Sequence, residues 1–307
     1  MMIRFAFAAG LALAAAPALA ATLVAGPGQT YKLPSQAINA AQPGDTVQIL
    51  PGDYVDCAFV RRNDITIEGK GAAKDVIMSD KTCGGKAILV VDGNNVTVRN
   101  MTLARAAVRD RNGAGIRAEG GNLTVDGVRF INNENGILSA PNPKATITIR
   151  NSLFDGNGGC YRVCAHGIYI GDIKKLLVEH SVFRDTHQGH HIKSRAAETD
   201  VVGSTIEDGP TGTASYLIDV ANGGKVLIEG NTMEKGPKAE NHTTAIMIGE
   251  DGVTHVSVKF VIKDNTFTND MPYPTYFVDN FTRGEAILTG NKFKGRVTPL
   301  RGLGSVH

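Results

Sequence analysis

Residues 189–196 read GHHIKSRA and gather two histidines, a lysine and an arginine within eight positions. The flanking segments are rich in β-branched and aliphatic residues, which favour strands over loops. Ammonium, guanidinium and imidazole groups held together can bind an anion and exchange protons with a ligand beside it. We therefore expect this stretch to carry chemistry if the surrounding elements turn its side chains toward one face.

A recurring phrase organises the chain: a short β-branched run, a small or polar pair, and then a bulky apolar residue. A second, weaker strand precedes most copies, and residues typical of turns separate them. Short strands repeated at steps of 23 to 34 residues predict a coil that stacks on itself, each strand pairing in parallel with its equivalent in the next coil. The third residues of the runs, used here as markers, are residues 67, 98, 125, 149, 178, 201, 228, 262 and 288.

These motifs make the chain resemble the right-handed parallel β-helix proteins of the pectin-lyase-like superfamily, over roughly residues 45–295. The resemblance implies an all-β solenoid, for which the markers predict about nine coils. The expected divisions are an N-terminal cap at 21–45 with a short helix near 34–41, the solenoid at 46–295 and a C-terminal tail at 296–307. Stacked amides at inward corners are expected from Asn100, Asn151, Asn231, Asn265 and Asn291.

The first twenty residues, MMIRFAFAAGLALAAAPALA, predict a secretory signal peptide cleaved after Ala20, because a short apolar run ends in small residues. The run is too short to favour a membrane anchor, so we expect a periplasmic or secreted protein. The four cysteines predict disulfides in such a compartment, and we favour Cys57–Cys83 and Cys160–Cys164 among the three pairings. A zinc site is disfavoured because no CxxC pair occurs.

The formal net charge of the 307 residues is only +2, which argues against nucleic acid as a partner. Any attraction for an anion must therefore be local. We expect a monomer that does not bind a membrane.

Alternation of side chains along a strand predicts that His191, Lys193 and Arg195 point outward. Alignment by distance to the following marker places Tyr169, Lys193 and Asp219 in one outward column on three successive coils, about 4.8 Å apart. Two alternatives involve no function. Lys193 and Asp219 could form an ordinary ion pair that contributes ~0–1 kcal/mol to stability, and Tyr169 could be a surface aromatic that fills a groove. Other polar residues that we expect near this column are His166, His190, Asn222, Glu240 and Asn241, with Met247 and Asp279 further along it.

The first hypothesis is a polysaccharide lyase or a related uronate-acting enzyme. Removing the C5 proton of a uronate requires a cation on its carboxylate and a base near C5. Lys193 and Arg195 could supply the cation, and Asp219 or Glu240 could orient the reacting groups. The candidate bases are Tyr169, His190, His166 and Lys193 itself, if Arg195 lowers the pKa of that lysine.

IKSRA (192–196) is similar to a Lys-Ser pair in β-helix lyases that act on alginate and dermatan-type polymers. That resemblance also implies an arginine on the next coil, but YLIDVANGG (216–224) contains none, so Arg195 would have to substitute. Calcium is a cofactor that the family allows, although no compact acidic cluster here demands a metal. The implied partner is an acidic polysaccharide. GHHIKSRA, TASY (213–216) and NGG (222–224) also resemble a group of exported bacterial β-helix proteins.

The second hypothesis is a glycoside hydrolase. AHGIYIG (165–171) and HIKS (191–194) resemble two motifs of polygalacturonases. Inverting hydrolysis needs two carboxylates, which that family places on coils before the histidine, and NGILSAPN (135–142) has none. A third hypothesis is a β-helix that binds carbohydrate, or serves as a structural element, without turnover.

Overall fold

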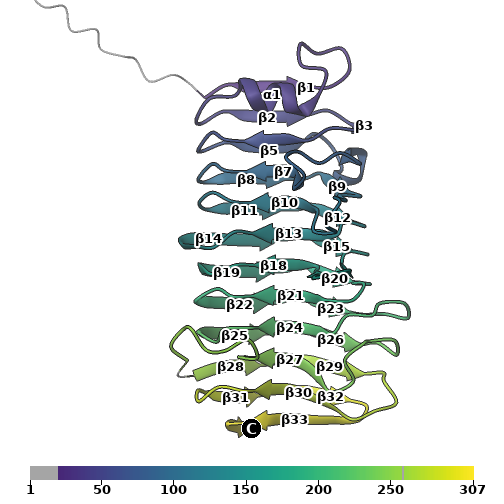
Figure 1. Cartoon of the computed structure of the whole chain (residues 1–307), viewed down its shortest axis with the longest axis vertical. Helices are drawn as coiled ribbons and strands as arrows, with labels where there is room; N and C mark the ends of the chain where they lie inside the picture. The colour runs from purple at the N-terminus through teal and green to yellow at the C-terminus, as the bar shows by residue number, and fades with distance from the viewer. Residues whose placement is uncertain (1–19, 258) are drawn as a thin grey trace, which may run out of the picture.

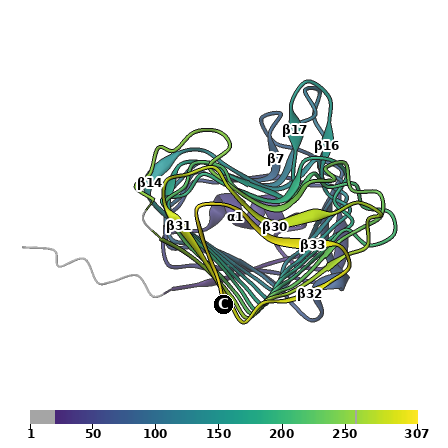
Figure 2. The same ribbon diagram turned by 90° about the horizontal axis from the view of Figure 1, so that it is seen from below.

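The computed structural model describes residues 20–257 and 259–307, which form a right-handed parallel β-solenoid of about 11 turns (Figure 1). Three parallel sheets of 12, 10 and 10 strands enclose the core, as the view along the axis shows (Figure 2). The predicted signal peptide lies outside the described residues, except for Ala20. Within those residues, none of the helices has the length and apolar character needed to cross a membrane.

We name the sheets A, B and C and give their strands in chain order. Sheet A comprises β1 (Thr22–Ala25), β2 (Thr46–Ile49), β5 (Thr66–Gly69), β8 (Val96–Arg99), β11 (Leu123–Asp126), β14 (Asn142–Arg150), β19 (Ile173–Glu179), β22 (Glu198–Val202), β25 (Lys225–Glu229), β28 (Lys259–Lys263), β31 (Glu285–Thr289) and β34 (Gly304–Val306). Sheet B comprises β3 (Gly52–Tyr54), β6 (Val76–Ser79), β9 (Thr102–Ala104), β12 (Arg129–Ile131), β15 (Leu153–Asp155), β20 (Val182–Arg184), β23 (Thr205–Glu207), β26 (Thr232–Lys235), β29 (Thr266–Asn269) and β32 (Lys292–Lys294). Sheet C comprises β4 (Ala58–Val60), β7 (Ala87–Val91), β10 (Ala114–Ala118), β13 (Asn135–Ser139), β18 (Ile168–Ile170), β21 (His190–Ser194), β24 (Tyr216–Val220), β27 (Thr244–Ile248), β30 (Thr275–Asn280) and β33 (Val297–Gly302). The remaining elements are α1 (Pro34–Ala40), the 3-10 helix η1 (Ala73–Asp75) and the two-stranded hairpin of β16 (Gly159–Cys160) and β17 (Cys164–Ala165).

The nine marker residues pair with one another along sheet A, each with the marker of the next coil. All nine side chains are buried, so the repeat in the sequence is the aliphatic ladder of the core. Burial of such a side chain contributes about 1.5–3 kcal/mol, which makes a shift of register costly.

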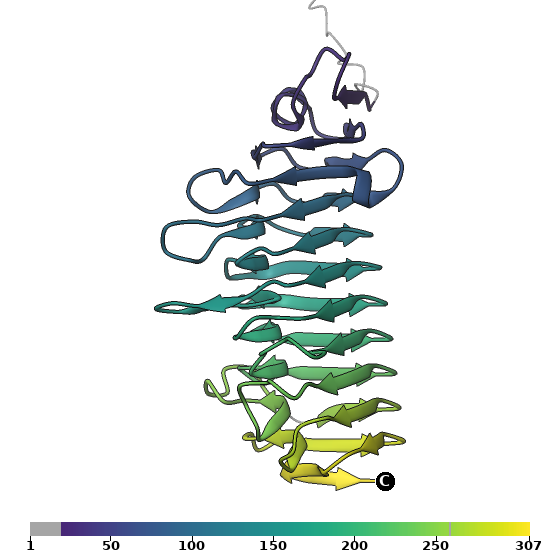
Figure 3. The ribbon, with the colours of Figure 1, turned by 90° about the vertical axis from the view of Figure 1, so that its right-hand side faces the viewer.

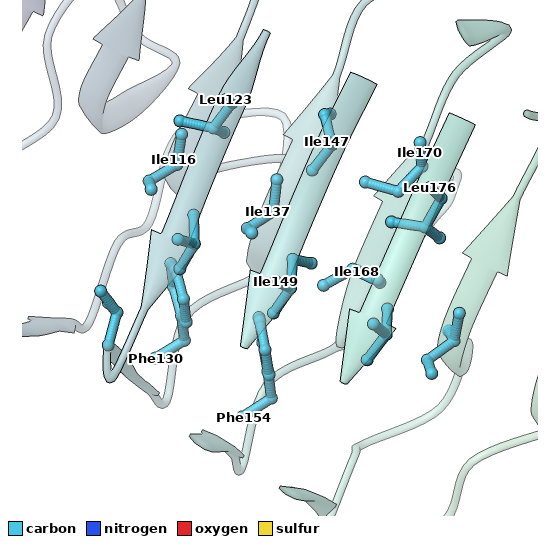
Figure 4. Close-up of a cluster of buried hydrophobic side chains, with 14 of the residues drawn as sticks. Ile116, Leu123, Phe130, Ile137, Ile147, Ile149, Phe154, Ile168, Ile170 and Leu176 are labelled. Carbon is cyan, nitrogen blue, oxygen red and sulfur yellow. The ribbon is translucent and has the colours of Figure 1, made fainter. Parts of the chain in front are cut away.

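Aromatic rings extend the core beneath sheet B. Phe130 stacks on Phe154 and Phe154 on Phe183, with ring centroids 4.5 and 4.4 Å apart (Figure 4). Gly136 makes room for this stack, because a Cβ atom there would lie 2.6 Å from the ring of Phe154. Stacked side chains of one type on successive coils hold the coils in register.

The corner between sheets A and B consists of two residues in each coil, the first with positive φ and the second pointing inward. Asn100 and Asn151 occupy the first position, with φ of 53° and 49°, where Gly127 and Gly203 lie in other coils. The prediction that Asn100 and Asn151 point inward is therefore wrong. Asparagine is chosen there because it tolerates the left-handed conformation.

The inward position of the same corner carries a polar ladder. The Nδ2 of Asn231 donates to the Oδ1 of Asn265 at 2.9 Å, and the Nδ2 of Asn265 donates to the Oδ1 of Asn291 at 2.9 Å. The prediction for these three asparagines is confirmed. In earlier coils Ser152 and Ser181 take this position and accept backbone N–H groups from the preceding coil.

Strand pairing continues beyond the predicted solenoid at both ends. α1 covers the N-terminal end with Ala37 and Ile38 buried, as predicted, and β1 pairs with β2 ahead of the first predicted coil. β33 and β34 lie in the predicted tail but pair with β30 and β31. The prediction of nine coils is therefore too low, because the terminal coils lack the repeated phrase.

Both predicted disulfides, Cys57–Cys83 and Cys160–Cys164, are present. The first joins coils that are adjacent in the solenoid, and the second closes the β16–β17 hairpin. Two formed disulfides are consistent with an oxidising compartment.

Candidate functional site

Sheet C carries the predicted column of outward side chains. Tyr169 pairs with Lys193, and Lys193 pairs with Asp219, on β18, β21 and β24. The column continues through Met247 to Asp279 on β27 and β30. The register that the sequence analysis predicts is therefore confirmed.

Lys193 lies between two carboxylates. Its Nζ donates to the Oδ2 of Asp219 at 2.7 Å and to the Oδ2 of Asp251 at 3.0 Å. Only 12% of its side chain is exposed. Burial disfavours the ammonium, but Asp219 and Asp251 outweigh that effect and raise the pKa of Lys193. The raised pKa contradicts the hypothesis that Arg195 lowers it, and it favours Lys193 as a cation over Lys193 as a base.

Asp219 is fully buried, and its Oδ1 has no hydrogen-bond partner in the described residues. Burial raises the pKa of Asp219 to about 6, although Lys193 opposes the change. The nearby carboxylates of Asp251 and Glu250 raise it further. Asp219 can therefore change protonation state close to neutral pH.

The guanidinium of Arg195 donates hydrogen bonds to three residues. Its Nε donates to the hydroxyl oxygen of Tyr169 at 2.9 Å, and its Nη1 donates to the Oδ1 of Asn222 at 2.7 Å. Its Nη2 donates to the Oδ2 of Asp251 at 2.5 Å. Asn222 is thus brought to the site as predicted, and it positions the guanidinium.

The sequence analysis missed Asp251, which lies in the loop between β27 and β28. The same Oδ2 atom accepts from both Lys193 and Arg195. Burial opposes the charge of Asp251, but these two cations hold its pKa below the usual value. His255 anchors the loop, with its Nε2 3.1 Å from the carbonyl oxygen of Arg195. Strand periodicity carries no information about such a loop, so no signal in the repeat could have identified Asp251.

The rings of His166 and His190 lie next to each other beside the column, tilted by 36° with their centroids 4.9 Å apart. The backbone N–H of His190 donates to the Nδ1 of His166 at 3.0 Å, and the N–H of Tyr216 donates to the Nδ1 of His190 at 3.2 Å. A neutral ring that accepts at Nδ1 carries its proton on Nε2. Burial lowers the pKa of His166 to about 3, and it also lowers the pKa of His190 well below the usual value. Both rings are therefore neutral donors, which argues against either one as the base.

The prediction that His191 points outward is wrong. His191 is fully buried, and its ring bonds to the Oγ1 of Thr186 at 2.7 Å and to the Oδ1 of Asp208 at 2.9 Å. Two successive residues point inward where each sheet C strand begins, as Leu217 and Ile218 do in the next coil, and His191 takes the first of these positions. Strict alternation fails at this bend.

Glu240 and Asn241 lie in the loop before β27. The Oε1 of Glu240 accepts from the Nε2 of Gln188 at 2.9 Å, and Asn241 accepts from the backbone and hydroxyl of Thr243. The hydrogen bonds of these two residues therefore brace loops rather than reach Lys193.

A calcium ion does not fit this site. Asp219 and Asp251 both face Lys193, and Arg195 also pairs with Asp251, so two cations already balance the two carboxylates. Across the described ranges, no group of three His, Cys, Asp or Glu side chains is arranged to hold a metal.

The profile of the family described as "Right handed beta helix region" matches residues 44–163 and 159–299. The chain belongs to the right-handed β-helix family. The predicted resemblance to pectin-lyase-like proteins is thereby confirmed at the level of fold. No curated protein sequence matches this β-helix protein.

Two solved structures with TM-scores above 0.5 share this fold. An alginate lyase from a Paenibacillus species is 19% identical and superposes with a TM-score of 0.66, covering 91% of this chain and 99% of that one. A protein from Geobacillus virus E2 is 14% identical, with a TM-score of 0.58 and coverage of 91% and 59%. The A-module of a mannuronan C-5 epimerase from Azotobacter vinelandii is 12% identical, with a TM-score of 0.48 and coverage of 89% and 94%.

Proposed function

We propose that this protein is exported and acts on an acidic, uronate-containing polysaccharide by removing the proton at C5, with β-elimination or epimerisation as the outcome. The observation that carries the proposal is the Asp251 carboxylate held jointly by Lys193 and Arg195. These two cations form a ready carboxylate site, and a uronate carboxylate would replace Asp251 there.

Lys193 and Arg195 neutralise the substrate carboxylate in this scheme. The C5 proton of a uronate becomes acidic only when the charge that spreads onto that carboxylate is stabilised. The raised pKa of Lys193 keeps the ammonium charged at neutral pH. Asp219 and Asn222 hold the two cations in place from the far side.

Tyr169 is the group best placed to accept the proton. Its hydroxyl oxygen already accepts a hydrogen bond from the Nε of Arg195, and a cationic donor stabilises negative charge on that oxygen. Lys193 remains an ammonium, and the histidines present Nε2–H rather than a free ring nitrogen. By elimination, Tyr169 takes the role of base as its phenolate, which the guanidinium of Arg195 stabilises, and proton transfer from C5 returns it to the neutral phenol.

The step after proton transfer decides the product. In elimination, the electron pair left at C5 forms the C4=C5 bond, the C4–O4 bond breaks, and the leaving oxygen takes a proton. In epimerisation, C5 takes a proton back on its opposite face. The neutral His190 offers an Nε2–H donor for either step, and this atom lies 3.5 Å from the Oδ2 of Asp219. Asp219, with its pKa of about 6, can resupply the proton.

The fold shared with the Paenibacillus alginate lyase supports the polysaccharide class. A polygalacturonase-type hydrolase is disfavoured, because the two nearby carboxylates both face Lys193 instead of opposing each other across a free sugar site.

The test is an exchange experiment in D2O on alginate, pectate, glycosaminoglycans and bacterial exopolysaccharides. NMR would detect deuterium at C5, and ultraviolet absorbance would detect unsaturated uronate. We expect exchange on at least one carboxylated polymer and none on the same polymer after carboxyl reduction, which is the matched control. Binding without exchange on every polymer would instead establish a non-catalytic carbohydrate-binding protein.

A further inference from the structure

The β16–β17 hairpin projects from the solenoid beside sheet C (Figures 2 and 3). The Cys160–Cys164 disulfide closes it and leaves Tyr161, Arg162 and Val163 at the tip. Tyr161 is 66% exposed and Val163 57% exposed. The disulfide holds the ring of Tyr161 in solvent, where it adds nothing to the core. An aromatic ring fixed in this way indicates a role in contacting a ligand.

The loop at 105–113 faces this tip and is also held firmly. The carboxylate of Glu134 accepts the backbone N–H groups of Val108 at 3.0 Å and Gly113 at 2.6 Å. The Nδ2 of Asn135 donates to the Oδ1 of Asn112 at 3.0 Å. The loop therefore presents its arginines from a preorganised backbone.

A cavity of about 780 Å³ lies between the loop and the tip, with Arg109, Asp110 and Asn112 on one side and Tyr161 and Arg162 on the other. This volume falls within the range of roughly 300–1,000 Å³ typical of ligand pockets. A smaller cavity next to it adds Arg111 and Glu134. Three guanidinium groups, those of Arg109, Arg111 and Arg162, line the two cavities together with two carboxylates, those of Asp110 and Glu134, so the net charge of the lining is positive.

The hairpin is tied to the Lys193 column. The side-chain oxygen of Gln188 accepts the backbone N–H of Cys160 at 2.8 Å, and Gln188 lies two residues before β21. The hairpin itself leads directly into β18, which carries Tyr169. The relative position of the two regions is therefore set by short, bonded connections.

We propose that the tip and the 105–113 loop form a second subsite, which binds a further anionic sugar of the same polymer that occupies the Lys193 site. This inference rests on the proposed function, since it names where a longer chain continues. The sugar ring stacks on Tyr161, and its carboxylate or sulfate group binds Arg109 and Arg162. A polyanion with a charge on each repeating unit matches two cationic sites held at a fixed separation.

The experiment measures calorimetric affinity for oligouronate fragments of increasing length. The protein would carry Tyr169→Phe, so that binding is read with little turnover while Lys193 and Arg195 keep the first site intact. We expect Kd to fall about tenfold once fragments span both sites. The double variant Arg109→Ala with Arg162→Ala should remove this gain in affinity. The shortest fragments should bind both forms equally. The matched control, Lys292→Ala with Lys294→Ala on β32, removes the same charge from sheet B and should keep the rise.

Two results would overturn the subsite: no length dependence in the parent protein, or equal loss for short and long fragments in the arginine variant. Equal affinity for carboxyl-reduced fragments would also contradict it. A lack of C5 exchange in the unsubstituted protein bears on the proposed function alone, because the subsite is measured by binding.

Discussion

Two cation–carboxylate pairs lie in the same outward column of sheet C, and they differ in how completely they are satisfied. Asp279 gives both oxygens to Arg301, which donates from Nε at 2.8 Å and also from Nη2. The guanidinium also lies over the ring of Tyr276, 4.5 Å from its centroid. Asp219, by contrast, gives one oxygen to Lys193 and leaves the other without a partner.

The comparison separates a saturated pair from one that keeps bonding capacity. A saturated, bidentate pair on the last coils has no bonding capacity left for a ligand. The Lys193 pair keeps an unbonded buried oxygen, shares its cation with Asp251 and adjoins Arg195. A buried carboxylate oxygen without a hydrogen bond lowers the stability of the fold. Such oxygens persist mainly where a site uses them for binding or catalysis.

The largest expected effect is on Lys193. Lys193→Met combined with Asp219→Asn should lower C5 exchange by about 1,000-fold, because the cation that stabilises the developing charge is lost. Replacing both partners avoids stranding a buried charge, which alone could unfold the protein. NMR of deuterium incorporation measures the rate.

The matched control is Arg301→Met with Asp279→Asn, which removes the other pair of the column. It should leave exchange unchanged and lower the free energy of unfolding by about 1 kcal/mol. Loss of C5 exchange in both double variants would mean that the two pairs do not differ in their role in the reaction.

Tyr169→Phe should lower C5 exchange by about 100-fold, since the phenol oxygen that accepts the proton is removed. Affinity for the polymer should change less than the rate, because Lys193 and Arg195 still bind the carboxylate. Single-turnover exchange together with calorimetric binding would separate the two. Full activity in this variant would reject Tyr169 as the base.

Asp219→Asn tests the cost of burying a carboxylate. Because the folded pKa of about 6 lies above the ordinary value of 3.8, protonated Asp219 contributes stability that is present below about pH 4 and lost as the pH rises through about 6. Relative to the variant, the original protein should lose about 2 kcal/mol between these limits. Urea unfolding at both pH values measures the difference, and parallel stability curves would contradict the assignment.

The smallest expected effect concerns Asp251. Asp251→Ala should lower KM by about threefold to tenfold, because a substrate carboxylate would no longer compete with this side chain for Lys193 and Arg195. Steady-state kinetics on the polymer identified by the exchange screen measures it. A higher KM would show that Asp251 assists binding instead of blocking it.

The sequence predicted the column because its two causes are periodic. The markers recur once per coil, and side chains alternate along a strand, so Tyr169, Lys193 and Asp219 could be aligned without coordinates. The same reasoning failed for His191, where two successive residues face the core. It also failed for Asn100 and Asn151, whose left-handed backbone turns them away from the ladder.

By itself, then, the sequence determined the solenoid and its register, because both depend on contacts between equivalent positions of neighbouring coils, and it favoured the two disulfides that the structure contains. Only the tertiary structure decided the burial, the hydrogen-bond partners and the charge of the groups around the column. The proton on each histidine depends on backbone N–H groups one coil away, and the charge of Lys193 depends on Asp251, which is 58 residues distant. Such burial and pairing arise only when separate segments meet, so no local pattern records them.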